Sequence, residues 1–300
     1  MSLASLGYVR LEMQDPNAWG EFAQSVLGFE KADISDPSGA VYLRMDDAPF
    51  RYLIEKGDAD RFVAAAYEVT SADALEALQQ RLSKAGVDFQ LGSEDEAARR
   101  AVGHYISCAD PSGNHVEFYV SRAAGSAVRL GAGVSGFLTG DMGLGHLVLP
   151  AAENVATEKF YTDVVGFGIS DDLSLPAFAE GMPEQRILFM HADNPRHHTL
   201  GLYNFPNPTG VIHLMAEMLS IDEVGHCMDR VKAAGLHIFA SLGRHANDEM
   251  VSFYFFAPGG IGFEIGFDGK QVADWSSFEA TQSTIGDIWG HEYDFPVVGE

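Results

Sequence analysis

The sequence has little cysteine, little positive charge and no long apolar segment. Its 300 residues include only two cysteines, Cys108 and Cys227, too few for a disulfide framework or a thiolate metal site. Lysine and arginine number 19 against 43 aspartates and glutamates. The net charge of -24 excludes the basic surface that nucleic acids and anionic membranes require. No apolar run reaches the roughly 18 residues that span a bilayer. We therefore expect neither a nucleic acid nor a membrane as partner.

The first 20 residues also lack the basic start and apolar core of a secretory signal, so we expect a cytoplasmic protein. The composition is otherwise that of a folded globular chain, with 46% hydrophobic and 21% charged residues. Histidine is distributed unevenly. Only His104 and His115 precede residue 146, and the other nine of the 11 histidines lie from there onward. Metal or acid–base chemistry is therefore expected in the second half of the chain.

The two halves of the sequence resemble each other over nearly the whole chain, which indicates an internal duplication. The first matched pair is strand-like, the second is a helical pattern that ends on glycine, and the third is an amphipathic helix. In the fourth pair a glycine-containing turn leads into a strand of alternating pattern. The pairs are 5–11 with 143–149, 18–30 with 156–168, 67–86 with 216–235, and 110–120 with 257–267.

Capping residues mark the ends of the two amphipathic helices. Ser71 and Ser220 occupy N-cap positions, and Gly86 and Gly235 follow as C-caps. Each half therefore contains two units, and each unit consists of a strand, a helix and further strands. We divide the chain into a first domain at 1–125, a linker at 126–142, a second domain at 143–270 and a tail at 271–300.

The second copy carries polar residues where its strands would otherwise be apolar. Alternation along 211–217 places His213 opposite the apolar face of its strand. Glu264 stands between Gly262 and Gly266, and we expect these two glycines to leave open space above the sheet for an ion and a substrate.

Together with His146, these two residues form a candidate metal site, since all three lie near strand ends at comparable positions. The first copy has Tyr8, Ala64 and Glu117 at the matching positions. Because two of the three ligands are missing there, the first module cannot build the same site. Two histidines and one carboxylate without cysteine are typical of non-haem Fe(II) centres that keep positions open.

These motifs resemble those of the type I extradiol catechol dioxygenases, members of the vicinal oxygen chelate superfamily. The resemblance covers the whole chain and is greatest to the subfamilies that act on 2,3-dihydroxybiphenyl and 1,2-dihydroxynaphthalene. It implies an α+β fold of two tandem domains, each made of paired βαβββ modules, with a metal-free first domain. The resembling segments are 134–149, 196–202, 212–214, 243–258 and 263–266.

The resemblance implies a metal ion held by His146, His213 and Glu264. Fe(II) is expected, and Mn(II) is possible because it uses the same ligand types. The implied reaction inserts both atoms of O2 into an aryl-substituted or bicyclic catechol beside its hydroxyls, in the breakdown of aromatic hydrocarbons. Family members commonly form homo-oligomers, so we expect one here.

The resemblance also assigns roles around the metal. His198 matches the family's acid–base histidine, which takes a proton from the catechol and returns one during ring opening. His245 matches a histidine that hydrogen-bonds the substrate, and Tyr254 matches a tyrosine that contacts a substrate hydroxyl. Asn247 and Asp248 match a loop beside the substrate pocket.

Some alternatives stay open at the level of sequence. His197 competes with His198, because strand alternation does not settle which of the two faces inward. A metal-dependent isomerase or lyase of the same superfamily is the alternative function, although such an enzyme would not need His198, His245 and Tyr254 together. A metal-free binding protein is the third reading, and the intact set of metal ligands argues against it.

Overall fold

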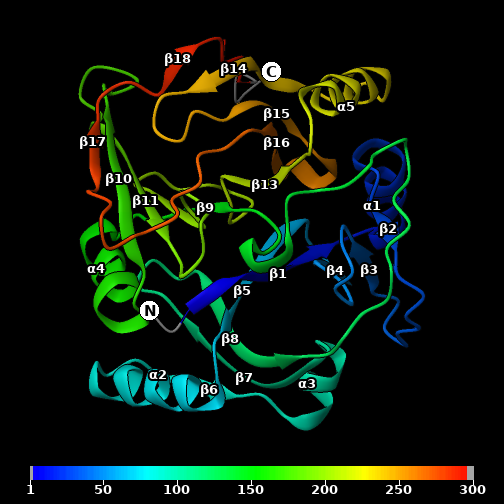
Figure 1. Ribbon diagram of the computed structural model, residues 1–300, viewed down its shortest axis with the longest axis vertical. Coiled ribbons are helices and arrows are strands. Elements are labelled where there is room, and N and C mark those ends of the chain that lie inside the picture. Colours follow the sequence, from blue (N-terminus) through cyan, green and yellow to red (C-terminus); the bar gives the residue numbers. More distant parts are fainter. Residues whose placement is uncertain (1–2, 296–300) are drawn as a thin grey trace.

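Two curved β-sheets, one from each repeat, dominate the structure, which is a computed structural model that describes residues 3–295 (Figure 1). Residues 1–2 of the expected first domain and 296–300 of the expected tail lie outside the described residues. The strands of the first sheet are β1 (Leu3–Met13), β2 (Glu30–Lys31), β3 (Val41–Arg44), β4 (Tyr52–Lys56), β5 (Arg61–Val69), β6 (Phe89–Leu91), β7 (Val102–Ala109) and β8 (His115–Arg122). Those of the second are β9 (Leu147–Pro150), β10 (Gly168–Leu175), β11 (Gln185–His191), β12 (Leu200–Tyr203), β13 (His213–Glu217), β14 (Ile238–His245), β15 (Val251–Phe256), β16 (Gly262–Phe267), β17 (Thr281–Ser283) and β18 (Asp287–Trp289).

The strand orders of the two sheets match and confirm the duplication. Within the described residues the first sheet runs β2-β3-β4-β1-β5-β8-β7-β6, and the second runs β17-β10-β11-β12-β9-β13-β16-β15-β14-β18. Replacing β1 to β8 by β9 to β16 turns the first order into the inner part of the second. In both sheets the fourth strand returns parallel to the first, as β4 to β1 and β12 to β9, which gives the expected βαβββ unit.

The helices of the two modules share N-caps and wide turns at matching positions. They are α1 (Pro16–Phe22), α2 (Ala72–Lys84), α3 (Glu94–Arg99), α4 (Asn154–Lys159) and α5 (Ile221–Ala233). Ser71 caps α2 and Ser220 caps α5, each through a side-chain oxygen that accepts a backbone N–H of the first turn, as predicted. A wide helical turn with i to i+5 bonding follows α1 at Ala23–Leu27 and α4 at Phe160–Val165.

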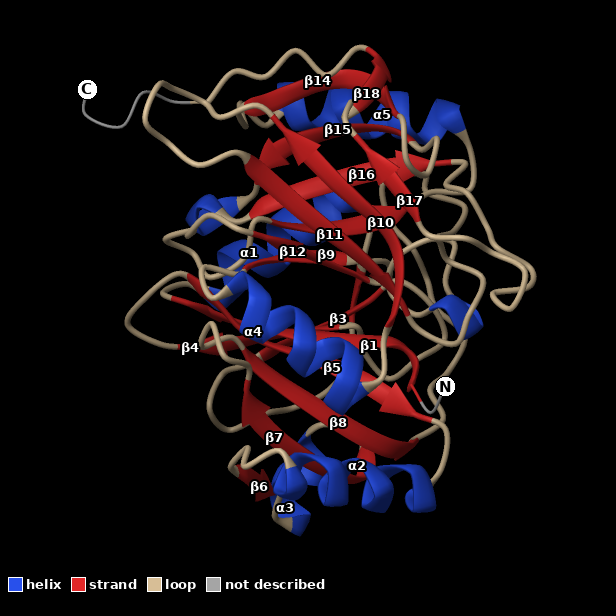
Figure 2. Cartoon of the chain, turned by 90° about the vertical axis from the view of Figure 1, so that its left-hand side faces the viewer, coloured by secondary structure: helices blue, strands red, loops and turns tan. Residues whose placement is uncertain are grey.

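The two modules interlock through these turns. Arg81 of α2 donates hydrogen bonds to the carbonyls of Val164 and Val165 in the second module. Arg230 of α5 donates in the same way to the carbonyl of Val26 in the first module. One apolar cluster contains core residues of both modules. Figure 2 shows the sheets one above the other, with α2 and α3 at one end of the molecule and α5 at the other. Among residues 3–295 no helix has the length and apolarity needed to cross a membrane.

The segment after residue 270 adds a strand to each edge of the second sheet. β17 pairs with β10, and β18 pairs with β14 at the opposite edge. Only residues 284–286 separate these strands, and four residue steps span at most about 14 Å. The end of β17 and the start of β18 therefore lie close together, so the second sheet is curled and this segment connects its two edges.

Candidate metal centre

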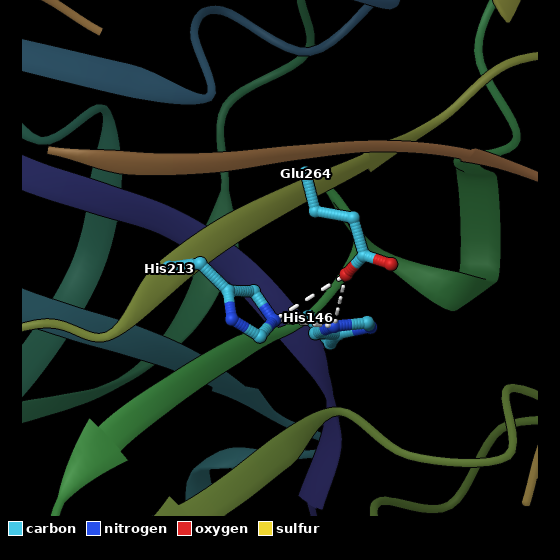
Figure 3. A group of neighbouring side chains, drawn as sticks. All are labelled: His146, His213 and Glu264. Carbon is cyan, nitrogen blue, oxygen red and sulfur yellow. Dashed lines mark hydrogen bonds and ion pairs between the residues drawn. The ribbon is translucent and has the colours of Figure 1, made fainter. Parts of the chain in front are cut away.

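Three neighbouring strands in the middle of the second sheet carry the predicted metal ligands. His146 directly precedes β9, His213 opens β13, and Glu264 lies in the middle of β16. β13 lies between the other two, antiparallel to β9 and parallel to β16. The three side chains converge on one point, where the carboxylate of Glu264 faces both imidazoles (Figure 3).

The spacing of the three atoms fits a single cation. Nε2 of His146 lies 3.2 Å from Nε2 of His213. Oε2 of Glu264 lies 3.1 Å from the first nitrogen and 3.3 Å from the second. Ligand atoms about 2.1 Å from one ion and at right angles to one another stand roughly 3.0 Å apart. The triangle therefore matches one face of an octahedral coordination sphere.

The charge and the hydrogen bonding of the three candidate ligands also suit a cation. Both oxygens of Glu264 and Nδ1 of His146 are buried and make no hydrogen bond of good geometry. Burial lowers the pKa of His146 to about 4, against the opposing effect of Glu264. Burial raises the pKa of Glu264, but the adjacent imidazoles of His146, His213 and His245 outweigh burial and leave that pKa well below its usual value. At pH 7 His146 and Glu264 are thus in the deprotonated forms that metal ions require.

The two glycines beside Glu264 do not leave open space, and that prediction was wrong. A Cβ at Gly262 would collide with the backbone carbonyl of Ile212, and one at Gly266 would collide with the sulfur of Met250. Glycine is needed there because the neighbouring chain segments pack directly against the strand.

The structure places His198 closer to the predicted metal ligands than His197. The His198 ring lies 4.1 Å from the His146 ring, between centroids, and 4.6 Å from Phe189. His197 lies behind it, with the two Nδ1 atoms 3.1 Å apart, and its ring contacts Phe278. Burial lowers the pKa of both imidazoles, that of His197 to about 3.

His245 and Tyr254 approach Glu264 from strands β14 and β15. Tyr254 is the cross-strand partner of Glu264. Its hydroxyl is 2.7 Å from Nε2 of His245, and the same nitrogen is 3.4 Å from Oε1 of Glu264. Burial would lower the pKa of His245, but hydrogen bonds to Asp287 and Glu264 outweigh it and raise that pKa to about 10.

The two predicted loop residues behave differently. Asp248 is buried, and its Oδ2 is 3.8 Å from Nδ1 of His198. Burial raises the pKa of Asp248 to about 6. The amide oxygen of Asn247 accepts the backbone N–H of Asp248, which is ordinary turn chemistry. A substrate-binding role for Asn247 stays a prediction.

Sequence reasoning missed two residues that contact this group. Asp287 and His291 lie in the segment expected to be a tail, yet Asp287 contacts His245, and His291 is buried beside both. No motif pointed to them. The available signal was the aromatic content around His291, with Trp289 and Tyr293 on either side, which is unusual for an unstructured tail.

At the matching position of the first module, the protein's own side chains already hydrogen-bond the carboxylate. Glu117 stands where Glu264 stands in the second copy, and its carboxylate accepts hydrogen bonds from Tyr8, Arg10 and Arg100. Because these donors occupy both oxygens and supply positive charge, a metal ion would have to displace them.

Two family models and several known proteins match this chain. The family model for the Glyoxalase/Bleomycin resistance protein/Dioxygenase superfamily matches residues 143–265. A second model, Dihydroxybiphenyl dioxygenase BphC D1, matches residues 6–57. An iron-dependent extradiol dioxygenase from Rhodococcus jostii is 40% identical over 296 residues, covering 98% of each chain.

Two further relatives extend this similarity. A biphenyl-2,3-diol 1,2-dioxygenase from Paraburkholderia xenovorans is 37% identical and covers 97% of this chain and 96% of its own length. The crystal structure of BphC, a halotolerant catechol dioxygenase, superposes with a TM-score of 0.88 at 30% identity, covering 97% of this chain and 95% of that one. The similarity in sequence and in fold therefore extends over both modules.

Proposed function

Because this chain belongs to the extradiol dioxygenases of the glyoxalase, bleomycin resistance protein and dioxygenase superfamily, we propose that it cleaves aryl-substituted or bicyclic catechols beside their hydroxyls. The observation that carries the proposal is the triangle of His146, His213 and Glu264, with His198, His245 and Tyr254 around it. A catechol such as 2,3-dihydroxybiphenyl is the expected substrate, as the name of the Paraburkholderia relative indicates.

His146, His213 and Glu264 would hold Fe(II), the metal in the name of the Rhodococcus relative, or Mn(II). Such a metal would supply a Lewis acid that lowers the pKa of the catechol hydroxyls and a common binding site for the catechol and O2. Because His146, His213 and Glu264 would supply only three ligands, positions on the metal would stay open for these reactants. Two neutral imidazoles and one carboxylate leave the centre with a net positive charge, which favours an anionic catechol.

The surrounding side chains would move protons and orient the ring. His198 would accept a catechol proton and return it, and because its Nδ1 faces His197, Nε2 is the atom available for this. Tyr254 and His245 would hydrogen-bond the same substrate oxygen, since their polar atoms converge to 2.7 Å from each other. Phe189 beside His198 offers an apolar surface to an aromatic substrate.

Two finer expectations go with this proposal. A homo-oligomer would cover exposed aromatic side chains such as Phe178, which is 60% exposed, and light scattering would report its mass. The cytoplasmic location also stays a prediction.

The proposal is tested by loading the purified protein with Fe(II) without oxygen and then adding air and a catechol. Catechol, 1,2-dihydroxynaphthalene and 2,3-dihydroxybiphenyl form a series of increasing size. We expect a coloured ring-opened product, formed fastest from the larger substrates. His146→Ala should lose both metal and activity, because it removes one of three ligands. A metal-loaded protein that opens none of the three rings would overturn the proposal and favour an isomerase or lyase.

A further inference from the structure

A carboxylate from the last described strand lies behind His245. β18 pairs with β14 so that Asp287 stands opposite His245. Oδ1 of Asp287 is 2.9 Å from Nδ1 of His245 and 2.6 Å from Nδ1 of His291. Because a carboxylate can only accept, both imidazoles donate an N–H to this oxygen from Nδ1.

This contact determines which nitrogen of His245 faces the predicted metal site. With Nδ1 bonded to Asp287, Nε2 points the other way, 2.7 Å from the Tyr254 hydroxyl and 3.3 Å from Oγ of Ser252. A ring rotated by 180° about χ2 would lose its bond to Asp287. Asp287 therefore selects one orientation of the His245 ring.

Asp287 is itself held by His291. Nε2 of His291 is 3.0 Å from the backbone carbonyl of Ser252 in β15, and its Nδ1 bonds Asp287. The side chain of His291 is fully buried, whereas that of Asp287 is 20% exposed. His291 thus connects Asp287 to the sheet at a second point, and the carboxylate is not free to swing into solvent.

The segment that supplies both residues belongs to the second module alone. The first sheet ends with β6 at one edge and β2 at the other, and none of its described strands corresponds to β17 or β18. The duplicated unit by itself therefore does not include Asp287 or His291. They occur in the copy that carries the His146, His213 and Glu264 triangle.

From this geometry we propose that Asp287, held by His291, is a positioning residue that orients His245 toward the substrate in the reaction proposed above. The inference rests on that proposed function for its catalytic consequence. Carboxylates bonded to metal-ligating histidines fix the tautomer and the ring orientation, and their loss costs about 10–100-fold in metal affinity or activity. Here Asp287 acts on a histidine beside the metal ligands, so the expected loss lies in turnover and not in metal content.

The first experiment compares Asp287→Asn with Asp268→Asn. The control removes the same charge from an exposed residue that pairs with Arg244, the neighbour of His245 on β14. Asp287→Asn should retain metal and lower kcat about 10–100-fold with a smaller change in KM. Asp268→Asn should leave kcat and KM as in the parent protein. A kcat for Asp287→Asn within twofold of the parent would overturn the inference.

A double-variant cycle separates positioning from general damage to the fold. If Asp287 acts through His245, then adding Asp287→Asn to His245→Ala should lower kcat no further. If Asp287 supports only the fold, the second change should lower kcat by the same factor in both backgrounds, and the inference fails.

A measurement without turnover keeps this test independent of the proposed function. In metal-free protein labelled with 15N-histidine, the Nδ1 of His245 should give the shift of a protonated, hydrogen-bonded nitrogen. Asp287→Asn should change this signal and leave that of the exposed His226 unchanged. An unchanged His245 signal would overturn the inference even in an active enzyme. Absence of ring cleavage with a changed signal would overturn the proposed function alone.

Discussion

Glu264 and Glu117 are the same residue type at matching strand positions, yet their surroundings differ completely. Glu264 faces the imidazoles of His146 and His213, and its oxygens lack hydrogen bonds of good geometry. Glu117 is surrounded by the guanidinium groups of Arg10 and Arg100. A buried carboxylate needs positive charge nearby. The first module supplies it from its own side chains, whereas the second leaves room for a cation.

Glu117 should therefore contribute to stability in a pH-dependent way. Burial raises its pKa, but Arg100 and Arg10 outweigh burial and hold the pKa below its usual value. Its contribution is complete above the unfolded pKa of about 4.3 and is lost as pH falls through the lower folded pKa. Glu117→Gln should cost about 3–5 kcal/mol of unfolding free energy at pH 7 and less in acid, as measured by urea unfolding. An equal loss for the exposed Glu94→Gln would contradict this explanation.

The pair His197 and His198 gives a second prediction at this scale. His198→Ala should keep the metal and lower kcat about 10²–10⁴-fold, because it removes the proposed proton acceptor. His197→Ala should cost much less, since its ring lies toward Phe278. Metal analysis and steady-state kinetics on both variants test this. A larger loss for His197→Ala would move the acid–base role to His197.

The two long helices, α2 and α5, carry the same capping residues and the same apolar pattern in the two modules. α2 and α5 each have 13 residues, a serine N-cap and three buried apolar side chains on one stripe. Each also reaches across to the other module through an arginine near its C-terminal end, Arg81 or Arg230. The same element thus forms its own module's core and joins the two modules.

The serine N-caps of α2 and α5 should contribute equally to the free energy of unfolding. Ser71→Ala and Ser220→Ala should each lower the unfolding free energy by about 1 kcal/mol, because each removes the acceptor for a backbone N–H in the first turn. Ser83→Ala, at an exposed position in the last turn of α2, should change it by less than about 0.5 kcal/mol. Thermal and urea unfolding of the three variants decide the matter. Equal effects at all three sites would refute the capping explanation.

For the whole molecule, the triangle of ligands implies that metal binding and folding stability are coupled. The candidate ligands lie just before β9 and in β13 and β16, which unfolding would separate. A cation that binds only the folded state stabilises it by about 2.7 kcal/mol when its free concentration is 100 times Kd.

We therefore expect added Fe(II), or Mn(II), to raise the midpoint of thermal unfolding and a chelator to reverse the rise. His146→Ala should show no rise. His104→Ala, which removes an exposed histidine of the first module, should behave like the parent protein. A rise of the same size in His146→Ala would place the metal elsewhere.

Much of this protein was predictable from short-range patterns. Periodicity and caps predicted the helices α2 and α5. The comparison of the two copies singled out His146 and His213 as histidines that the first copy lacks, beside a glutamate, Glu264, that both copies share. These signals depend on residues a few positions apart, and the duplication supplied an internal reference for each of them.

Only the tertiary structure decided the rest, because it depends on contacts between distant segments. Asp287 meets His245 across 42 positions, through a strand that joins the sheet at its edge. His198 lies nearer the candidate metal ligands than His197, with its ring 4.1 Å from that of His146. Gly262 leaves no open space because the carbonyl of Ile212 fills it. The sequence determined the repeated unit and its candidate ligands, and the packing of distant segments against the second sheet decided which further side chains surround them.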